Sequence, residues 1–149
     1  MAIAPYISKT EISKRVQELA EMINRDFAGQ EVLVVGVLQG AFIFCADLLR
    51  EIKVPVLFDF VALSSYEGTE STGQVKMKLD LKHDVYARNV IVIEDIVDTG
   101  LTMSYFLNEL KSRQPKNLKL CSLLLKRSRL KVEVPIDYLG FDIEDKFVI

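Results

Sequence analysis

The sequence predicts an α/β domain in which helices flank a mostly parallel, twisted sheet. Strands that are buried on both faces of a sheet form apolar runs without polar alternation, and residues 31–38, 89–94 and 117–125 are runs of this kind. A segment of helical periodicity follows each of the first two runs before the next strand begins. Strand–helix–strand units of this kind place their strands parallel in one sheet.

An amphipathic helix is expected before the first strand, because apolar residues recur at helical spacing and charged residues fill the other face. Its apolar positions are Ile12, Val16, Leu19, Ala20 and Ile23. Ser8 or Thr10 can cap the start of this helix, and Gly29 stands just past its end.

The next elements follow the first strand, which ends before Gly40. Residues 41–52 are apolar nearly all round, which predicts a buried helix. Residues 56–64 predict a second strand. Residues 65–74 are polar, contain two glycines and lack apolar periodicity, so we expect a flexible loop, and the alternating residues 75–81 predict a half-exposed strand.

The second half of the chain repeats the order of strand, helix and strand. After the strand at 89–94, apolar residues recur at i, i+3, i+4 and i+7 and predict a helix through Met103, Phe106, Leu107 and Leu110. The strand at 117–125 follows, and the tail at 138–149 predicts one or two short strands.

Composition and charge narrow the range of possible functions. At 149 residues the chain is expected to form one domain, and its net charge of −2 gives no global attraction to nucleic acid or to an anionic membrane. No apolar run is long enough to span a bilayer. Cys45 and Cys121 are expected to be buried, reduced thiols, and His83, the only histidine, is expected to be exposed. We therefore predict a cytoplasmic protein.

Polar residues follow each predicted strand, and the carboxyl ends of strands are where open α/β sheets bind ligands. These residues should share one rim of the sheet. They are Gln39 and Gly40, then Ser65 and Tyr66, then residues 94–102, and finally Lys126.

Three carboxylates follow the third strand within five positions. Along a strand Glu94 and Asp95 point to opposite sides, and Asp98 lies beyond the strand, so the three need not repel one another at contact distance. Carboxylates do not bind phosphate, and they suit ribose hydroxyls, a divalent cation or a proton instead.

The segment that follows these acids predicts a phosphate cradle. The first backbone amides of the next helix lack partners within the helix, Gly100 allows close approach, and Thr99 and Thr102 add hydroxyls. A ribose phosphate with a metal ion would use both the cradle and the acids. Two alternatives remain: Asp98 and Thr99 only cap the helix, or Asp-Thr-Gly is the motif of aspartic proteases, which requires a second carboxylate in a β-rich fold.

The stretch resembles the phosphoribosyl-diphosphate (PRPP) binding motif of the type I phosphoribosyltransferases, and it reads Glu94-Asp95-Ile96-Val97-Asp98-Thr99-Gly100-Leu101-Thr102. Residues 64–76, 121–127 and 140–149 resemble, in order and spacing, segments of the hypoxanthine(-guanine) phosphoribosyltransferases. The resemblance covers nearly all of the chain. It implies the fold predicted above, with a small hood from the chain ends and a flexible loop over the active site.

The resemblance also implies a reaction, in which N9 of hypoxanthine or guanine displaces diphosphate from C1 of PRPP. Thr99, Gly100 and Thr102 would hold the 5′-phosphate. Glu94 and Asp95 would bind the ribose hydroxyls and, partly through these hydroxyls or water, Mg²⁺. Asp98 would act at N7 of the purine as the proton acceptor or its stabiliser.

The same resemblance assigns the remaining candidates. Lys126 would donate to O6 of the base, Phe147 would stack on it and the Val148 backbone would read its edge, while Ser65 and Tyr66 open the loop that closes over the reaction. Without the resemblance, Lys126 is a surface lysine at a strand end, Phe147 is a core residue and the loop is a surface hairpin.

The chain departs from the family pattern at two places. Gln39, which with Gly40 would contact diphosphate, stands where the family usually has lysine, and the family often has a non-proline cis peptide there. The family also continues beyond residue 149 with a segment that completes the site. We therefore expect a single domain over 1–149 that lacks the usual C-terminal segment.

Other functions on the same fold stay open. One is a PRPP-sensing regulator that binds nucleic acid, for which Lys126, Arg127, Arg129 and Lys131 form a small basic cluster. Another is a transferase for xanthine or a pyrimidine. The family tends to form dimers and tetramers, so a homodimer or homotetramer is expected.

Overall fold

The computed structural model describes residues 6–64 and 75–145 of the chain. The predicted hood involves chain ends outside these residues. In chain order the elements are α1 (Lys9–Asp26), β1 (Val32–Leu38), α2 (Phe42–Glu51), β2 (Val56–Leu63), β3 (Met77–Leu79), β4 (Asn89–Val97), α3 (Leu101–Ser112), β5 (Asn117–Leu125), the 3₁₀ helix η1 (Arg127–Arg129) and β6 (Tyr138–Asp142).

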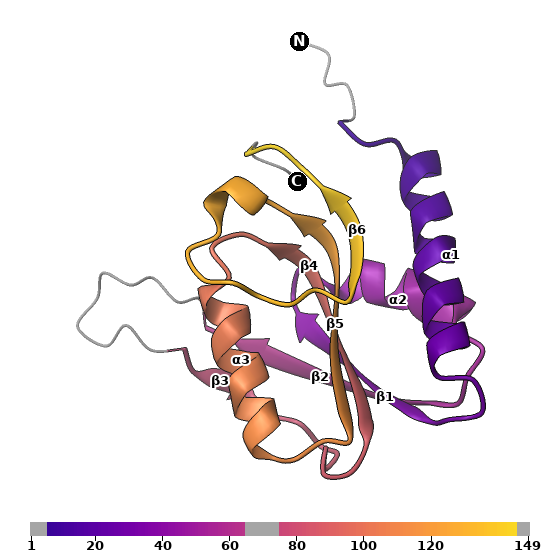
Figure 1. Cartoon of the computed structure of the whole chain (residues 1–149), viewed down its shortest axis with the longest axis vertical. Coiled ribbons are helices and arrows are strands. Elements are labelled where there is room, and N and C mark those ends of the chain that lie inside the picture. The colour runs from indigo at the N-terminus through magenta and orange to yellow at the C-terminus, as the bar shows by residue number, and fades with distance from the viewer. Residues whose placement is uncertain (1–5, 65–74, 146–149) are drawn as a thin grey trace.

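The strands form one sheet in the order β3-β2-β1-β4-β5-β6. Every neighbouring pair is parallel except β2 and β3, which run antiparallel. Helices α1 and α2 lie on one face of the sheet and α3 lies on the other (Figure 1). This arrangement confirms the predicted α/β class, and it brings the carboxyl ends of β1 and β4 together at the centre of the sheet.

The first helix begins where its capping residue predicts. The Ser8 hydroxyl accepts a hydrogen bond from the Glu11 amide at 3.1 Å, and the Glu11 carboxylate accepts one from the Ser8 amide at 3.2 Å. This reciprocal capping box identifies Ser8, rather than Thr10, as the cap. Gly29 has φ +74° in the turn after the helix, a conformation that glycine adopts without a steric penalty.

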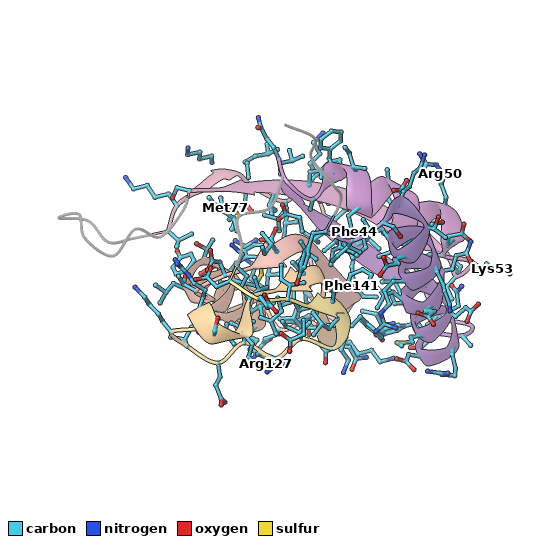
Figure 2. All side chains as sticks on the ribbon, turned by 90° about the horizontal axis from the view of Figure 1, so that it is seen from above. Phe44, Arg50, Lys53, Met77, Arg127 and Phe141 are labelled. Carbon is cyan, nitrogen blue, oxygen red and sulfur yellow. The ribbon has the colours of Figure 1, made fainter. Side chains whose placement is uncertain are left out.

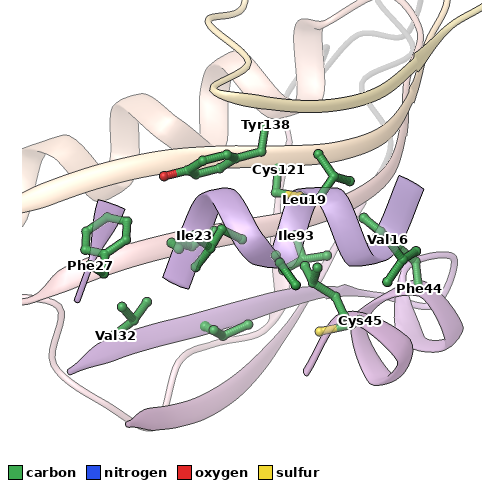
Figure 3. Packing of buried hydrophobic residues seen from close by; sticks show 14 residues of the cluster. Val16, Leu19, Ile23, Phe27, Val32, Phe44, Cys45, Ile93, Cys121 and Tyr138 are labelled. Carbon is green, nitrogen blue, oxygen red and sulfur yellow. The ribbon is translucent and has the colours of Figure 1, made fainter. Parts of the chain in front are cut away.

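The core has two halves, one on each face of the sheet, because successive residues of a strand point to opposite faces. Val32 and Val34 of β1 pack with α1 and α2, as Figure 3 shows for Val32 among its neighbours, whereas Leu33 and Val35 pack on the α3 side. Cys45 and Cys121 are buried, free thiols, as predicted. Burial raises the pKa of the Cys45 thiol to about 12.

The prediction of a fully buried α2 is wrong at its start. Phe44, Cys45 and Leu48 face the core, but Phe42 is 54% exposed and Ile43 is 61% exposed. The helix lies against the sheet and α1 on one side only, and a pattern that is apolar all round does not tell which side stays uncovered.

Two strand boundaries also differ from the prediction. β4 continues past the apolar run to Val97, because Ile96 and Val97 pair with Leu124 and Leu125 of β5. β3 is shorter than predicted, covering Met77–Leu79 at the edge of the sheet.

The prediction that His83 is exposed is wrong, because His83 contacts a buried carboxylate, Asp59 on β2. Asp59 Oδ2 accepts hydrogen bonds from the backbone amides of Lys82 and His83, both at 2.8 Å, and lies 3.0 Å from His83 Nδ1. His83 is therefore half-buried. Its local sequence could not show a contact with a residue 24 positions away.

Within the described residues, no helix is long and apolar enough to cross a membrane.

Asp59→Asn is expected to destabilise the fold by about 2 kcal/mol at pH 7, because an amide cannot accept from all of these donors. Burial would raise the pKa of Asp59, but the hydrogen bonds from His83 and Lys82 outweigh it, and the pKa lies below the usual 3.8. The contribution of a depressed carboxyl is fully present above its unfolded pKa and is lost as pH falls through the folded pKa.

Urea unfolding from pH 7 to pH 3 checks this expectation. The difference between wild type and Asp59→Asn should be constant down to about pH 4 and shrink below it. Asp80→Asn is the control, because the contacts of Asp80 among the described residues are exposed: it accepts from the adjacent Leu81 amide at 2.7 Å and pairs with Arg113 at 3.4 Å. Equal losses for the two variants, or a difference that does not change with pH, would contradict the role assigned to Asp59.

Candidate functional site

A pocket of about 430 Å³ opens at the carboxyl ends of β1 and β4, beside the start of α3. This is the rim where the sequence predicts ligand binding, and the volume lies in the range of small-molecule sites. Predicted site residues that line it are Gly40, Glu94, Asp95, Ile96, Val97, Asp98, Thr99, Gly100 and Thr102.

Two acids at the end of β4 are closer together than strand alternation predicts. The Asp95 amide donates to Glu94 Oε1 at 2.9 Å, so the Glu94 side chain turns back toward its neighbour. Burial, and next the Asp95 carboxyl, raise the pKa of Glu94 well above its usual range. The expectation that these carboxylates stay apart is wrong, because a glutamate side chain is long enough to bend back along its own strand.

The end of β1 meets the same acids. A Cβ atom added to Gly40 would collide with the Asp95 carboxylate, so a larger residue here would require the Asp95 side chain to move. The peptide bond between Leu38 and Gln39 is cis, as the family resemblance implied. Gln39 is exposed in the turn before α2.

The start of α3 lies at the position where the sequence predicts the cradle. Gly100 is the N-cap residue with φ +82°, and the Thr99 hydroxyl accepts from the Leu101 amide at 3.3 Å. The Thr99 carbonyl accepts from the Lys131 amide at 2.9 Å. Donors at a helix start favour an anion, and Thr102 adds its side chain to the pocket wall one turn along.

Lys126 lies at the end of β5, and its surroundings differ from those of a surface lysine. Only 8% of the residue is exposed, and its backbone amide donates to the Val97 carbonyl at 3.0 Å. Its ammonium is 3.8 Å from Asp145 Oδ1. Lys126 is not among the residues that line the pocket, but its hydrogen bond to Val97 ties it to one that does. A nearly buried ammonium is suited to bind a polar group of a ligand.

Asp98 has a partner that the sequence did not predict. Arg129 Nε donates to Asp98 Oδ1 at 3.0 Å, and Arg129 Nη1 lies 3.7 Å from Asp145 Oδ2. Arg127, two residues earlier, pairs with Asp142 at 2.7 Å. Both arginines of the basic cluster are thus matched by carboxylates, which weakens the hypothesis of a nucleic-acid-binding face.

The sequence places Arg129 in the basic cluster but does not predict its contact with Asp98, because the two residues are 31 positions apart. Ser65, Tyr66, Phe147 and Val148 lie outside the described residues, so their predicted roles stay predictions.

Comparisons with known proteins agree with this geometry. The family model of the phosphoribosyl transferase domain matches residues 7–149. Hypoxanthine-guanine phosphoribosyltransferase of Mycobacterium tuberculosis is 41% identical over 96% of this chain and 74% of its own length. Hypoxanthine phosphoribosyltransferase of Salmonella typhimurium is 42% identical over 96% of this chain and 82% of its own length.

Solved structures show the same relationship. A crystal structure of a hypoxanthine-guanine phosphoribosyltransferase from Bacillus anthracis, with a HEPES molecule in its active site, has a TM-score of 0.90 and 44% identity. The match covers 97% of this chain and 84% of that one. The chain therefore belongs to the type I phosphoribosyltransferase family, among the hypoxanthine(-guanine) phosphoribosyltransferases.

Proposed function

We propose that this purine-salvage enzyme transfers the 5-phosphoribosyl group of PRPP to N9 of hypoxanthine, and also of guanine. The bond from N9 to C1 of the ribose forms as the bond from C1 to diphosphate breaks, giving IMP or GMP and free diphosphate. The observation that carries the proposal is one pocket whose wall combines Thr99, Gly100 and Thr102 at a helix start with the paired carboxylates Glu94 and Asp95. The nearly buried Lys126 is attached to this wall by its hydrogen bond to Val97. The substrates in the names of the relatives support the same reaction.

PRPP would enter with its 5′-phosphate at the start of α3. Thr99, Gly100, Leu101 and Thr102 would hold this phosphate through backbone amides and hydroxyls, helped by the positive end of the helix dipole. At the end of β1, Gln39 and Gly40 would contact the diphosphate through backbone amides. A glutamine side chain brings a donor there but no positive charge.

Mg²⁺ fits the acids at this rim. The described residues contain no group of three or more side chains that could hold a metal ion, and Mg²⁺ commonly takes one or two carboxylates and completes its shell with water and substrate oxygens. Glu94 and Asp95 would hold the ion, partly through ribose hydroxyls or water, and a cation there would offset the charge crowding between them. When bound, Mg²⁺ would stabilise negative charge on the leaving diphosphate.

The base would lie between the ends of β4 and β5. Asp98 would accept the proton at N7 or stabilise it there, and the Lys126 ammonium would donate to O6. Because adenine carries an amino donor in place of O6, this lysine would disfavour it. Phe147 would stack on the base, the Val148 backbone would read its edge, and Ser65 and Tyr66 would belong to the loop that closes over the site and excludes water.

A screen of bases tests the proposal. The protein is incubated with PRPP and Mg²⁺ and with hypoxanthine, guanine, xanthine, adenine or uracil, and diphosphate release is measured. We expect turnover of hypoxanthine and guanine, with hypoxanthine outcompeting xanthine when the two are mixed. Turnover of adenine or uracil without either 6-oxopurine would refute the assignment of Lys126.

We also propose that the enzyme works as a homodimer or homotetramer in the cytoplasm. Phe42 and Ile43 at the start of α2 and Phe58 on β2 are large apolar side chains that stay exposed, which supports association. Sedimentation equilibrium measures the oligomeric state directly. The cytoplasmic location stays a prediction.

A further inference from the structure

Four side chains of alternating charge form a chain beside the pocket. Arg129 Nε is 3.0 Å from Asp98 Oδ1, and Arg129 Nη1 is 3.7 Å from Asp145 Oδ2. The other oxygen of Asp145 is 3.8 Å from Lys126 Nζ. The carboxylate proposed to act at N7 and the ammonium proposed to bind O6 are therefore joined through two intervening residues.

The backbone around Arg129 is fastened to the segment that carries Asp98. The Lys126 amide donates to the Val97 carbonyl at 3.0 Å, and the Lys131 amide donates to the Thr99 carbonyl at 2.9 Å. These two hydrogen bonds bracket Arg129 on one side and Asp98 on the other. The guanidinium thus starts from a backbone whose position relative to Asp98 is set.

The distance between Asp98 and Lys126, the two ends of this series of ion pairs, matters for binding of the base. O6 and N7 lie on the same edge of a 6-oxopurine, next to each other. One base can engage a donor at O6 and a carboxylate at N7 only if these groups are held a few ångström apart, and small displacements at a reacting centre are costly to rate.

We infer that Arg129 and Asp145 are positioning residues that set the separation of the Asp98 carboxylate from the Lys126 ammonium, so that both engage one edge of the purine. The inference rests on the proposed function. Arginine suits this task because its planar fork can bind two carboxylates at once, whereas the single ammonium of lysine is a point charge on a flexible stem.

A merely structural role for Arg129 predicts a different outcome. The Arg129 side chain is 48% exposed, and the side chains of its partners Asp98 and Asp145 are 43% and 48% exposed. Exposed ion pairs contribute little to stability, so the loss of Arg129 should leave the fold intact. Any large change in turnover would then report on the geometry of the site.

The same short helix provides a matched control. Arg127 also comes from η1 and also binds a carboxylate, Asp142, at 2.7 Å, but its side chain has no ion pair with Asp98 or Asp145 among the described contacts. Figure 2 shows Arg127 at the surface, on a different side of the molecule from Arg50 and Lys53. Arg127→Ala removes one η1 arginine and one ion pair without touching the proposed chain.

The experiment measures steady-state kinetics with hypoxanthine, PRPP and Mg²⁺ for five forms of the protein. We expect Arg129→Ala to lower kcat at least about fivefold, a part of what positioned acid–base groups contribute, while KM for PRPP changes less than about twofold. Arg129→Lys should recover only part of the loss, and Asp145→Asn should mainly raise KM for hypoxanthine. Arg127→Ala should stay within about twofold of wild type in every constant.

A double variant separates positioning from an independent effect. If Arg129 acts through Asp98, then Asp98→Asn/Arg129→Ala should be no slower than Asp98→Asn alone, within about twofold. Multiplied losses would overturn the inference, and so would a wild-type kcat in Arg129→Ala or an equal loss in Arg127→Ala. A wild-type protein that turns over no 6-oxopurine would instead refute the proposed function, and this inference with it.

Discussion

Replacing Asp98 with asparagine is expected to lower kcat with hypoxanthine at least about tenfold, the low end of what a positioned general base contributes. Asparagine keeps the size of the side chain and an oxygen that can accept from Arg129, whose hydrogen bond to Asp98 Oδ1 is 3.0 Å. It cannot take a proton or match a developing positive charge at N7. The loss should therefore appear in kcat, while KM for PRPP stays within about threefold, because the phosphate cradle begins only after this residue.

Asp142→Asn is the matched control for Asp98→Asn. Asp142 is also a carboxylate that binds an η1 arginine, at 2.7 Å, but it is the last residue of β6 and does not follow β4. Its replacement should change kcat less than about twofold. Unchanged kcat in Asp98→Asn, measured at saturating hypoxanthine and PRPP, would rule out the proton role of Asp98.

The order and type of the main elements followed from local patterns. β5 covers Asn117–Leu125, the range predicted, and β1 differs from its prediction by one residue. Local rules worked here because a strand buried on both faces must be apolar throughout and a half-buried helix must repeat every three to four residues. Where a boundary depended on pairing with a distant strand, as at Ile96 and Val97, the prediction stopped too early.

In the candidate site, too, local features could be predicted from the sequence and contacts between distant residues could not. Residues 94–102 are contiguous, so their shared position at one strand end and one helix start could be inferred from sequence. The contacts of Arg129 with Asp98 and of Lys126 with Asp145 depend on how the chain folds back after β5. No local pattern encodes such distances, which is why charges read as a basic cluster proved to be paired.

Gly100→Ala is expected to damage both stability and PRPP binding. Gly100 has φ +82°, and a Cβ atom there would lie 2.8 Å from Val134 Cγ2 and 3.1 Å from the Val132 carbonyl oxygen. The left-handed conformation costs alanine about 1–2 kcal/mol, and overpacking adds about 1–3 kcal/mol. Relief of the collision requires the start of α3 to move, so the amides at Leu101 and beyond would be misplaced. KM for PRPP should rise roughly tenfold or more.

Gly29→Ala distinguishes the collision from the backbone conformation. Gly29 has φ +74°, nearly the same as Gly100, but nothing lies within 4 Å of an added Cβ. This variant should lose only the conformational cost, about 1–2 kcal/mol, and keep the KM of wild type for PRPP. Urea unfolding and initial-rate kinetics on the two variants measure both effects. If Gly100→Ala loses no more stability than Gly29→Ala and binds PRPP normally, the start of α3 does not require a bare backbone, and the 5′-phosphate must bind elsewhere.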